Sequence, residues 1–333
     1  MGDIFGALAT IVIGLGVFVG GLLLIYAATN TVVPRRFREG SQIAVFLGPA
    51  LVLIVIGLVI PALRTIWLSL LTDKKGLPFG GLTNYKYIFT DQNERIALLN
   101  SALWVLFGGT LSTFLGLTIA RYADGAKGEA TAKSLIFIPS ALSLAGAGII
   151  WKFVFDGPPF DYGLLNAITK AIPGWPRGFG GDGQRIWLLE HPAQMNTFLL
   201  IIILVWVQTG FATVVLSAAI KGVPEALAEA ATVDGATKRQ VFYRVTLPYI
   251  RPALLTVMTT GTIASLKAFD IVQATTGGNF NTSTIANEMY TKFFLENRDG
   301  LASALAVLLF IIVIPVVVLN QRGQKRAQEM MGA

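Results

Sequence analysis

The sequence of 333 residues contains no cysteine and one histidine, His191. Disulfides, thiolate metal sites and cysteine nucleophiles are therefore excluded, and so are multi-histidine metal centres. Charged residues make up only 14% of the chain, against about 25% in soluble domains. So few charges do not cover the surface of a soluble protein of this size, and the mean hydropathy of +0.65 agrees. We expect lipid around much of the chain, a solvated His191, no catalytic residue and no bound metal.

Seven apolar runs are long enough to cross a hydrocarbon core, which takes about 20 helical residues. Nothing in the chain shows the roughly ten-residue alternating segments of a membrane β-barrel. The sequence therefore predicts an all-α, polytopic membrane protein with about seven transmembrane helices. The runs are Ile4–Tyr26, Ile43–Trp67, Ser101–Arg121, Ser134–Phe155, Thr197–Ile220, Pro252–Val272 and Leu301–Leu319.

The distribution of lysine and arginine among the connections predicts the orientation. One alternating set of connections holds fourteen basic residues, and the opposite set holds nine over longer loops. Because cytoplasmic loops carry the excess of lysine and arginine, we expect the N-terminus outside and the C-terminus in the cytoplasm. The net charge of +7 then reflects membrane topology, so nucleic acid is not an expected partner.

A polar stretch, EAATVDGATKRQVFYRVTLP at Glu229–Pro248, joins the fifth and sixth runs on the predicted cytoplasmic side. Pro224 and the acids after it suit a helix start. Asp234-Gly235 predicts a turn in which Gly235 has a positive φ. Thr237 predicts the cap of a second short helix, which Leu247-Pro248 ends. By composition alone, this is an ordinary solvated loop of two helices.

The spacing in this stretch resembles the EAA loop of permease subunits in binding-protein-dependent ABC importers. The family pattern is EAA, three residues, Gly, nine residues, Ile, one residue and Leu-Pro. The chain departs from it only at Val245, which replaces isoleucine. The resemblance implies that a loop at residues 221–251 couples to an ATPase. Its expected coupling residues are Glu229, Ala230, Ala231, Asp234, Gly235, Leu247 and Pro248.

The resemblance extends over about residues 43–322 and is to the carbohydrate type. The segments that carry it are FLGPALVLIVIGLVIPALRTIWLSL, FIPSALSLAGAGIIWKFVFDGPPFDYGLLN and SLKAFDIVQATTGGN, with Val272, Thr275 and Asn279 as departures. It implies a six-helix importer core at residues 43–333. Residues 1–42 then form an extra transmembrane helix and a basic cytoplasmic connection. The extra helix makes the α-glucoside and maltose permeases the most similar type.

Nothing in the sequence can bind ATP in the manner of an ABC ATPase. The dipeptide Gly-Lys does not occur, so the P-loop pattern GxxxxGK[ST] is excluded. The resemblance implies that partner ATPase subunits bind ATP and magnesium, so this chain needs no cofactor. The implied complex holds a second permease subunit, two ATPase subunits and an extracytoplasmic solute-binding protein. The external segment Asp156–Asn196 either contacts that binding protein or only closes the outer face.

Carbohydrate permeases also imply a sugar site near mid-membrane that is lined from three helices. An aromatic side chain can stack on a sugar face, and polar side chains can bond to hydroxyls. On the sixth run, four of the candidates share one helical face at i, i+3, i+4 and i+7. The expected lining residues are Ser140, Leu144, Val207, Gln208, Phe211, Thr260, Ile263, Ala264 and Lys267. The alternative is that these side chains only pack helices.

Lys267 stands out because an ionisable residue inside a membrane helix is costly, and it tends to be functional or paired. Asp270 lies three residues further on and is a ready partner. A structural ion pair and a contact with sugar therefore remain open for Lys267.

Two classes of function remain. The first is a permease subunit of an ABC importer for a sugar such as maltose, trehalose or another α-glucoside, with polyamine, phosphate or peptide as alternative solutes. The second is a secondary transporter or a membrane enzyme. Secondary carriers place acids at mid-membrane for coupling to ions, whereas Asp270 is the only acid within the predicted spans. The sequence favours the first class.

Overall fold

The computed structural model describes residues 2–32, 34–72, 78–157, 163–174, 185–189, 194–266 and 268–330. Contacts divide the chain into two units, Met1–Trp67 and Leu68–Ala333. The described residues are mainly helical, and the only strand-like pairing among them is an isolated bridge between Leu71 and Phe79. The predicted all-α class is confirmed. The boundary expected at residue 42 stays a prediction.

In the first unit, α1 (Gly2–Val32) packs beside α2 (Arg35–Ile54), and the ring centroids of Tyr26 and Phe46 are 5.5 Å apart. The second expected run continues from α2 through a π-helical turn, η1 (Val55–Val59), into α3 (Ile60–Ser69). In that turn the N–H of Ile60 donates to the carbonyl of Val55, five residues back. Since Pro61 lacks an N–H and its ring crowds the preceding turn, the wider turn lets the helix continue through the proline.

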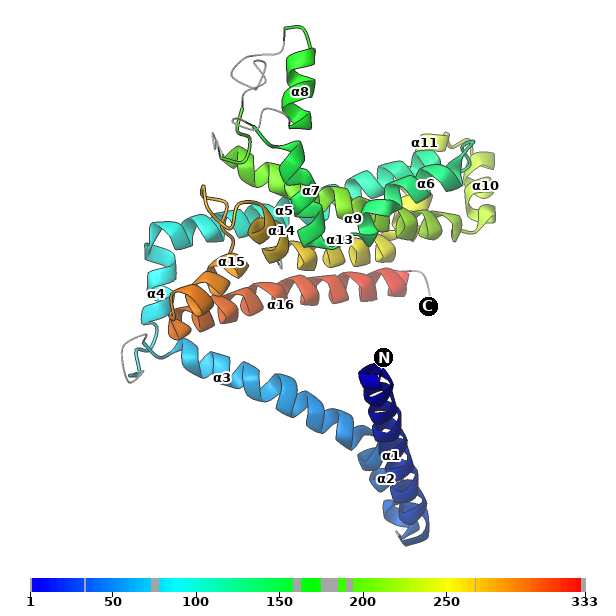
Figure 1. Cartoon of the computed structure of the whole chain (residues 1–333). Coiled ribbons are helices and arrows are strands. Elements are labelled where there is room, and N and C mark those ends of the chain that lie inside the picture. The colour runs from blue at the N-terminus through cyan, green and yellow to red at the C-terminus, as the bar shows by residue number, and fades with distance from the viewer. Residues whose placement is uncertain are drawn as a thin grey trace. The chain divides into compact units, whose positions relative to one another are not determined.

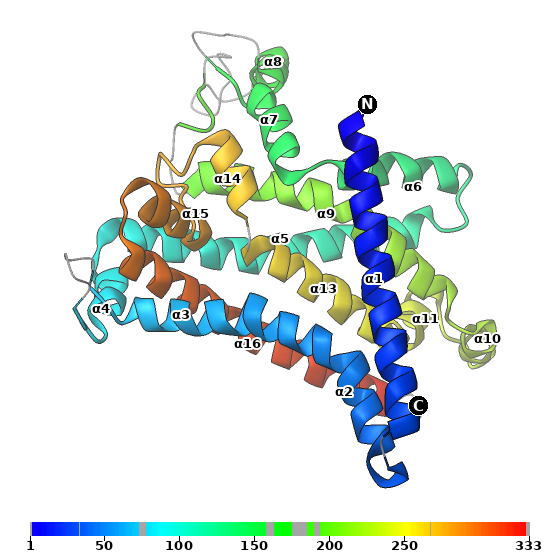
Figure 2. The same cartoon turned by 60° about the horizontal axis from the view of Figure 1, so that its bottom comes forward.

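In the second unit, four long helices lie lengthwise beside one another, as Figures 1 and 2 show. They are α5 (Gln92–Ala123), α9 (Met195–Lys221), α13 (Arg251–Leu266) and α16 (Asp299–Met330). Shorter elements lie toward the end of the unit where α5 and α9 begin. They are α4 (Thr83–Thr90), α7 (Leu144–Val154), α8 (Leu164–Ala171), α14 (Phe269–Thr275), α15 (Ile285–Tyr290) and η6 (Thr291–Leu295).

The long helices approach closely where their side chains are smallest. A Cβ atom added to Gly109 of α5 would lie 2.7 Å from the backbone nitrogen of Thr262 in α13. One added to Gly116 would lie 2.5 Å from the Cβ of Ala212 in α9. Small residues let helix backbones approach in membranes, where dispersion contacts rather than hydrophobic burial hold helices together. These contacts place α5 at the centre of the second unit.

Four helices are long and apolar enough to cross a membrane among the described residues: Ala9–Ala27, Gly40–Ser69, Gln92–Ala123 and Met195–Lys221. The fourth and sixth expected runs are helix pairs, bent by 103° and 44° respectively. The apolar part of the seventh expected run is the shorter helix Asp299–Pro315. Two of the seven expected runs are therefore bent helix pairs, and the number of membrane spans stays a prediction.

The 103° bend lies between α6 (Glu129–Phe137) with its 3-10 turn η2 (Ile138–Ala141) and α7. Pro139 sits at the start of η2, and Ser143 has extended backbone angles. The hydroxyl of Ser143 accepts a hydrogen bond of 3.1 Å from the N–H of Gly146, which caps α7. A proline followed by a capping serine stops one helix and starts the next.

At the end of the unit where α5 and α9 begin, side-chain amides from these two helices hold the loop that follows α14. The amide nitrogen of Asn100 donates to the carbonyls of Asn281, at 2.7 Å, and Ser283, at 2.8 Å. Asn196 donates to the carbonyl of Phe280 at 2.7 Å. Asn100 and Asn196 are fully buried, so these bonds satisfy loop carbonyls that have little access to water. They tie α5, α9 and the α14–α15 loop together.

Beside this loop, the ammonium of Lys292 lies 2.9 Å from Glu296 and 3.5 Å from both Glu94 and Glu288. Burial alone would lower the pKa of Lys292. The hydrogen bond to Glu296 and the charges of the other carboxylates more than offset burial, so the pKa is raised. Lys292 therefore stays charged at neutral pH and neutralises part of a buried acidic cluster.

We predict that Gly109→Val destabilises the chain by about 1–3 kcal/mol, because the added methyl groups meet the backbone of α13. Thermal unfolding in detergent measures this as a lower Tm. Thr110→Val is the matched control, since Thr110 is the exposed neighbour of Gly109 and the change is nearly isosteric. Equal melting temperatures for the two variants would contradict the close packing of α5 on α13.

Candidate functional site

The predicted coupling loop begins with α10 (Glu225–Val233), which follows Pro224. Its end forms a two-bond cap: the N–H of Gly235 donates to Thr232 at 3.0 Å, and that of Ala236 donates to Ala231 at 2.9 Å. This pattern requires a left-handed residue at the turn, and Gly235 has a φ of +83°. The predicted turn at Asp234-Gly235 and its positive φ are confirmed.

The second half of the loop starts with a capping box. The hydroxyl of Thr237 accepts from the N–H of Gln240 at 3.4 Å, and the Gln240 side chain accepts from the N–H of Thr237 at 2.7 Å. The predicted cap is confirmed. The helix then runs through α11 (Lys238–Val241), the π-helical turn η5 (Phe242–Thr246) and α12 (Leu247–Tyr249).

This helix ends at Tyr249, one residue after the predicted end at Leu247-Pro248. Pro248 itself lies within the helix: Leu247 donates its N–H to the carbonyl of Phe242, five residues back, so the helix widens before the proline. This is the arrangement that also precedes Pro61 in the first unit. In both places a π-helical turn accommodates the proline that would otherwise break an α-helix.

The surface of α10 is unusually open. None of its residues is buried, and within the described chain it packs on α11 and η5. One exposed stripe of the helix carries Ala226, Glu229, Ala230 and Val233, at spacings of three and four residues. Val233 is 87% exposed, and Leu227 beside the stripe is 43% exposed. Apolar side chains in water beside one carboxylate are typical of a surface that another protein covers.

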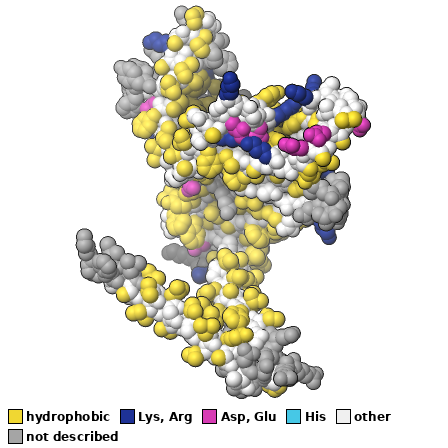
Figure 3. All heavy atoms as spheres, turned by 90° about the vertical axis from the view of Figure 1, so that its right-hand side faces the viewer, with side chains coloured by type: hydrophobic (Ala, Val, Ile, Leu, Met, Phe, Trp, Pro, Cys, Tyr) yellow, Lys and Arg dark blue, Asp and Glu magenta, His cyan; other side chains and the backbone are white. Residues whose placement is uncertain are grey.

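Val233 and Leu227 escaped the sequence analysis because the family motif does not include them. The sequence does carry a signal, since both are branched aliphatic residues in a helix otherwise made of alanine, glutamate and threonine. Ala231, by contrast, is half-buried and lines a cavity of about 260 Å³ with Asp234, Gly235 and Arg244. The coupling candidates thus divide between an outward stripe and the inner turn. Figure 3 looks at the end of the second unit that carries them, where acidic and basic side chains gather among apolar ones.

The structure brings some of the predicted sugar-site residues together. The hydroxyl of Ser140, at the bend, donates to the carbonyl of Val207 at 2.8 Å. Val207 is buried, and Leu144 and Ala264 pack against the same apolar cluster. These four residues therefore come from three elements, α6–α7, α9 and α13, that meet around one cluster. A sugar contact by any of them stays a prediction.

The other candidates keep accessible side chains. Phe211 is 37% exposed, and Gln208 and Ile263 are half-buried. Thr260 is exposed, and its hydroxyl donates to the carbonyl of Thr256 in its own helix at 2.9 Å. Lys267 and His191 lie outside the described residues, so the proposed pair of Lys267 with Asp270 stays a prediction.

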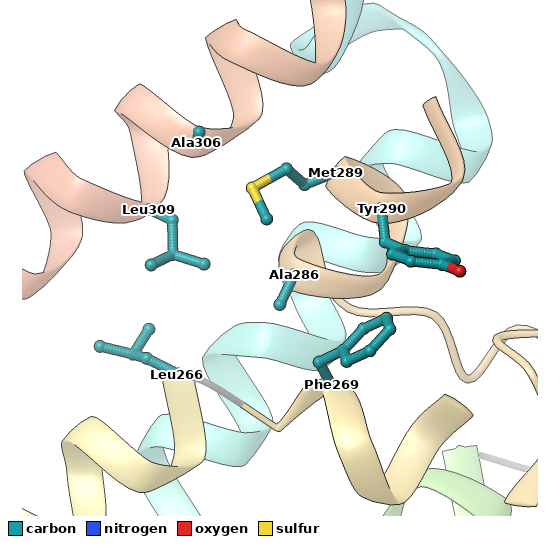
Figure 4. A pocket seen from close by; sticks show the side chains of 7 residues that line it. All are labelled: Leu266, Phe269, Ala286, Met289, Tyr290, Ala306 and Leu309. Carbon is teal, nitrogen blue, oxygen red and sulfur yellow. The ribbon is translucent and has the colours of Figure 1, made fainter. Parts of the chain in front are cut away.

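An apolar cavity of about 320 Å³ opens between α13, α14, α15 and α16. Its lining consists of Leu266, Phe269, Ala286, Met289, Tyr290, Ala306 and Leu309. Figure 4 shows that the hydroxyl of Tyr290 points away from the other side chains. The cavity therefore lacks the polar groups that fix a sugar in place, and it is distinct from the predicted sugar site.

The family model for the inner membrane component of binding-protein-dependent transport systems matches residues 112–328. The chain belongs to this family. The match covers the bent pair α6–α7 and the whole coupling loop. The predicted resemblance to importer permeases is confirmed.

Curated relatives agree. An osmoprotective compounds uptake permease from Synechocystis is 43% identical over 86% of this chain and 99% of its own length. An α-glucoside transport system permease from Rhizobium meliloti is 40% identical over 89% of this chain and 87% of its own. A trehalose/maltose permease from Thermococcus litoralis is 27% identical over 84% and 92%. These relatives are transport permease subunits, which agrees with the prediction that the chain is not an enzyme.

A solved structure shares the fold. A chain in the crystal structure of a bacterial alginate ABC transporter, in complex with an alginate pentasaccharide-bound periplasmic protein, superposes with a TM-score of 0.70. The superposition covers 88% of this chain and 96% of that one, at 20% identity. The predicted importer permease fold is confirmed.

We predict that position 235 accepts residues according to their tolerance of a left-handed backbone. Gly235→Val should loosen the turn, because β-branched side chains at φ of +83° are strained by about 1–2 kcal/mol. Gly235→Asn is the matched control, because asparagine visits this conformation readily. Amide hydrogen exchange over residues 225–249 measures the effect as faster exchange in the valine variant. Equal exchange in both variants would show that the turn does not depend on glycine.

Proposed function

We propose that this chain is the permease subunit of an ABC sugar importer, that it forms half of the translocation pathway, and that α10 is its contact with a cytoplasmic ATPase. The observation that carries the proposal is the exposed stripe of α10, with Glu229 between small residues and Val233 at its end. Together with the missing P-loop, it supports ATP hydrolysis on a partner chain.

The proposed assembly follows from the single coupling loop. The chain has one such loop and no internal repeat, so a symmetric pair of ATPases requires a second permease to supply the other. Closure of the ATPases on ATP would move α10 and switch the pathway between inward and outward access by rigid-body rotation. We place α10 and both ends of the loop in the cytoplasm and the loop after α14 on the outer side.

The proposed substrate is a sugar or oligosaccharide with α-glucosidic character, such as maltose or trehalose. The names of two relatives, an α-glucoside permease and a trehalose/maltose permease, support it. A second candidate is an osmoprotective compound, favoured by the 43% identity to a permease for such compounds. Transport assays with binding proteins loaded with maltose, trehalose or a panel of osmoprotective compounds separate the two.

We predict that Glu229→Lys and Val233→Asp each reduce ATP hydrolysis stimulated by loaded binding protein at least about tenfold, because each places the wrong charge in a docking surface. The complex in liposomes is assayed for phosphate release. Val233→Ile is the matched control and should retain stimulation, since it keeps an apolar β-branched side chain. Normal stimulation in both charged variants would make α10 a solvated connector only.

We predict that Ala264→Trp and Gln208→Ala lower sugar uptake while basal ATP hydrolysis is kept. The first fills space beside the apolar cluster that Leu144 and Val207 share, and the second removes a donor for a hydroxyl. Uptake of radiolabelled maltose and trehalose into proteoliposomes measures the loss, with Ala264→Ser as the control. Unchanged uptake in both variants, with normal assembly, would remove α9 and α13 from the sugar path.

A further inference from the structure

Four charged side chains meet at the cytoplasmic end of the second unit, outside the family's coupling motif. Lys133 of α6 pairs with Asp124, the residue that ends α5, and with Glu129 at 2.7 Å. Glu129 also pairs with Lys221, the last residue of α9. The hydroxyl of Ser217 donates to Asp124 at 2.7 Å. We call Asp124, Glu129, Lys133 and Lys221 the charge cluster.

The charge cluster is electrically balanced and partly shielded. It holds two basic and two acidic side chains: those of Lys133 and Asp124 are only 15% and 14% exposed, whereas those of Glu129 and Lys221 are 23% and 55% exposed. Surface ion pairs contribute little, but shielded networks with several hydrogen bonds hold their geometry more firmly. The cluster therefore fixes the start of α6 against the ends of α5 and α9.

The charge cluster lies beside the root of α10, by which we mean the residues that join α9 to α10. Lys221 ends α9, and α10 starts at Glu225. The other half of the loop is held from α5 as well, because the guanidinium of Arg121 lies 4.0 Å from the ring centre of Phe242. Cation–π contacts of this kind are strongest when partly shielded from water. Both halves of the coupling loop are thus anchored at the inner end of α5.

A second tie joins α6 to α9 at the bend. The hydroxyl of Ser140 donates to the carbonyl of Val207. A Cβ atom on Gly210 would lie 2.4 Å from the carbonyl oxygen of Ile136, so the end of α6 rests directly on the backbone of α9. Contacts therefore hold both ends of α6 to α9, and α6 leads directly into the bend that carries Ser140.

We propose that Lys133 is a positioning residue for coupling: through the charge cluster it locks α6 to the root of α10, so that movement of α10 reaches the bend between α6 and α7. The inference rests on the proposed function, since it needs an ATPase on α10. It assigns to α6 a role that the coupling motif does not contain. The ATPase displaces α10 through its exposed stripe, and the charge cluster passes that displacement on to α6.

The test uses the complete complex in liposomes and exploits the absence of cysteine. Spin labels on Thr232→Cys in α10 and Leu135→Cys in α6, both exposed positions, report the distance between the two helices. With Lys133 present, we expect one narrow distance distribution that is the same without nucleotide and with ATP and vanadate. In Lys133→Met, the distribution should broaden or shift with ATP and vanadate, and maltose or trehalose taken up per ATP hydrolysed should fall about 2- to 30-fold.

Three controls separate transmission from folding. Lys133→Arg keeps the charge and should keep the ratio of uptake to hydrolysis. Lys127→Met removes an exposed lysine of the neighbouring turn and should change neither readout. The double variant Lys133→Met with Asp124→Asn also removes the carboxylate that Lys133→Met alone leaves unpaired. It should therefore assemble as the unmodified chain does. It should still show the altered distance distribution and the lower ratio of uptake to hydrolysis.

The outcomes are distinct. If the double variant assembles with an unchanged distance distribution and an unchanged ratio of uptake to hydrolysis, the cluster only balances charge and the inference is overturned. A lower Tm with both readouts unchanged would also overturn it. If the unmodified complex shows no response to ATP at all, the proposed function itself fails, and that result is separate from any effect of Lys133.

Discussion

The fold depends on the close approach of α5 to its neighbours. Gly109 meets the backbone of α13, and Gly116 meets Ala212 of α9, with no side chain between them. In a hydrocarbon solvent the gain from packing comes mainly from dispersion and fitted surfaces, so contacts between small residues set which helices pair. Because α5 holds both neighbours, its two ends become the places where loops from distant parts of the chain are gathered. The amide ties of Asn100 are at one end, and Arg121 and Asp124 are at the other.

Much of the coupling loop could be predicted from the sequence, because local chemistry determines it. Gly235 follows a helix and precedes a capping threonine, which leaves few conformations for the turn. The helix end predicted at Leu247-Pro248 is one residue early, because Pro248 lies within the helix and Tyr249 ends it. A proline usually ends a helix, and the π-helical turn that avoids this requires no special residue in the sequence. Pro61 and Pro248 both continue their helices in this way.

The bend between α6 and α7 could have been predicted, and the charge cluster could not. Pro139 and Ser143 are a stop and a cap within an apolar run, but hydropathy averages over both. The cluster joins Asp124, Lys133 and Lys221, and Lys221 lies far from the other two along the chain. Taken alone, Lys133 and Lys221 look like basic residues that follow the topology rule for loops, and Asp124 looks like an ordinary acid in a turn. Only the packing of α6 on α9 shows that they meet.

The two ends of the second unit are held by different sets of contacts. Where α5 and α9 begin, buried amides bond to loop carbonyls, and Lys292 pairs with three glutamates beside them. Such bonds lose most of their value if the groups separate by a small distance in a place without water. Where α5 and α9 end, the charge cluster and the contact of Arg121 with Phe242 hold α6 and the coupling loop. Both ends are therefore expected to move together with α5 and α9. Under the proposed function, a displacement of α10 then turns these helices without separating the loop after α14 from them.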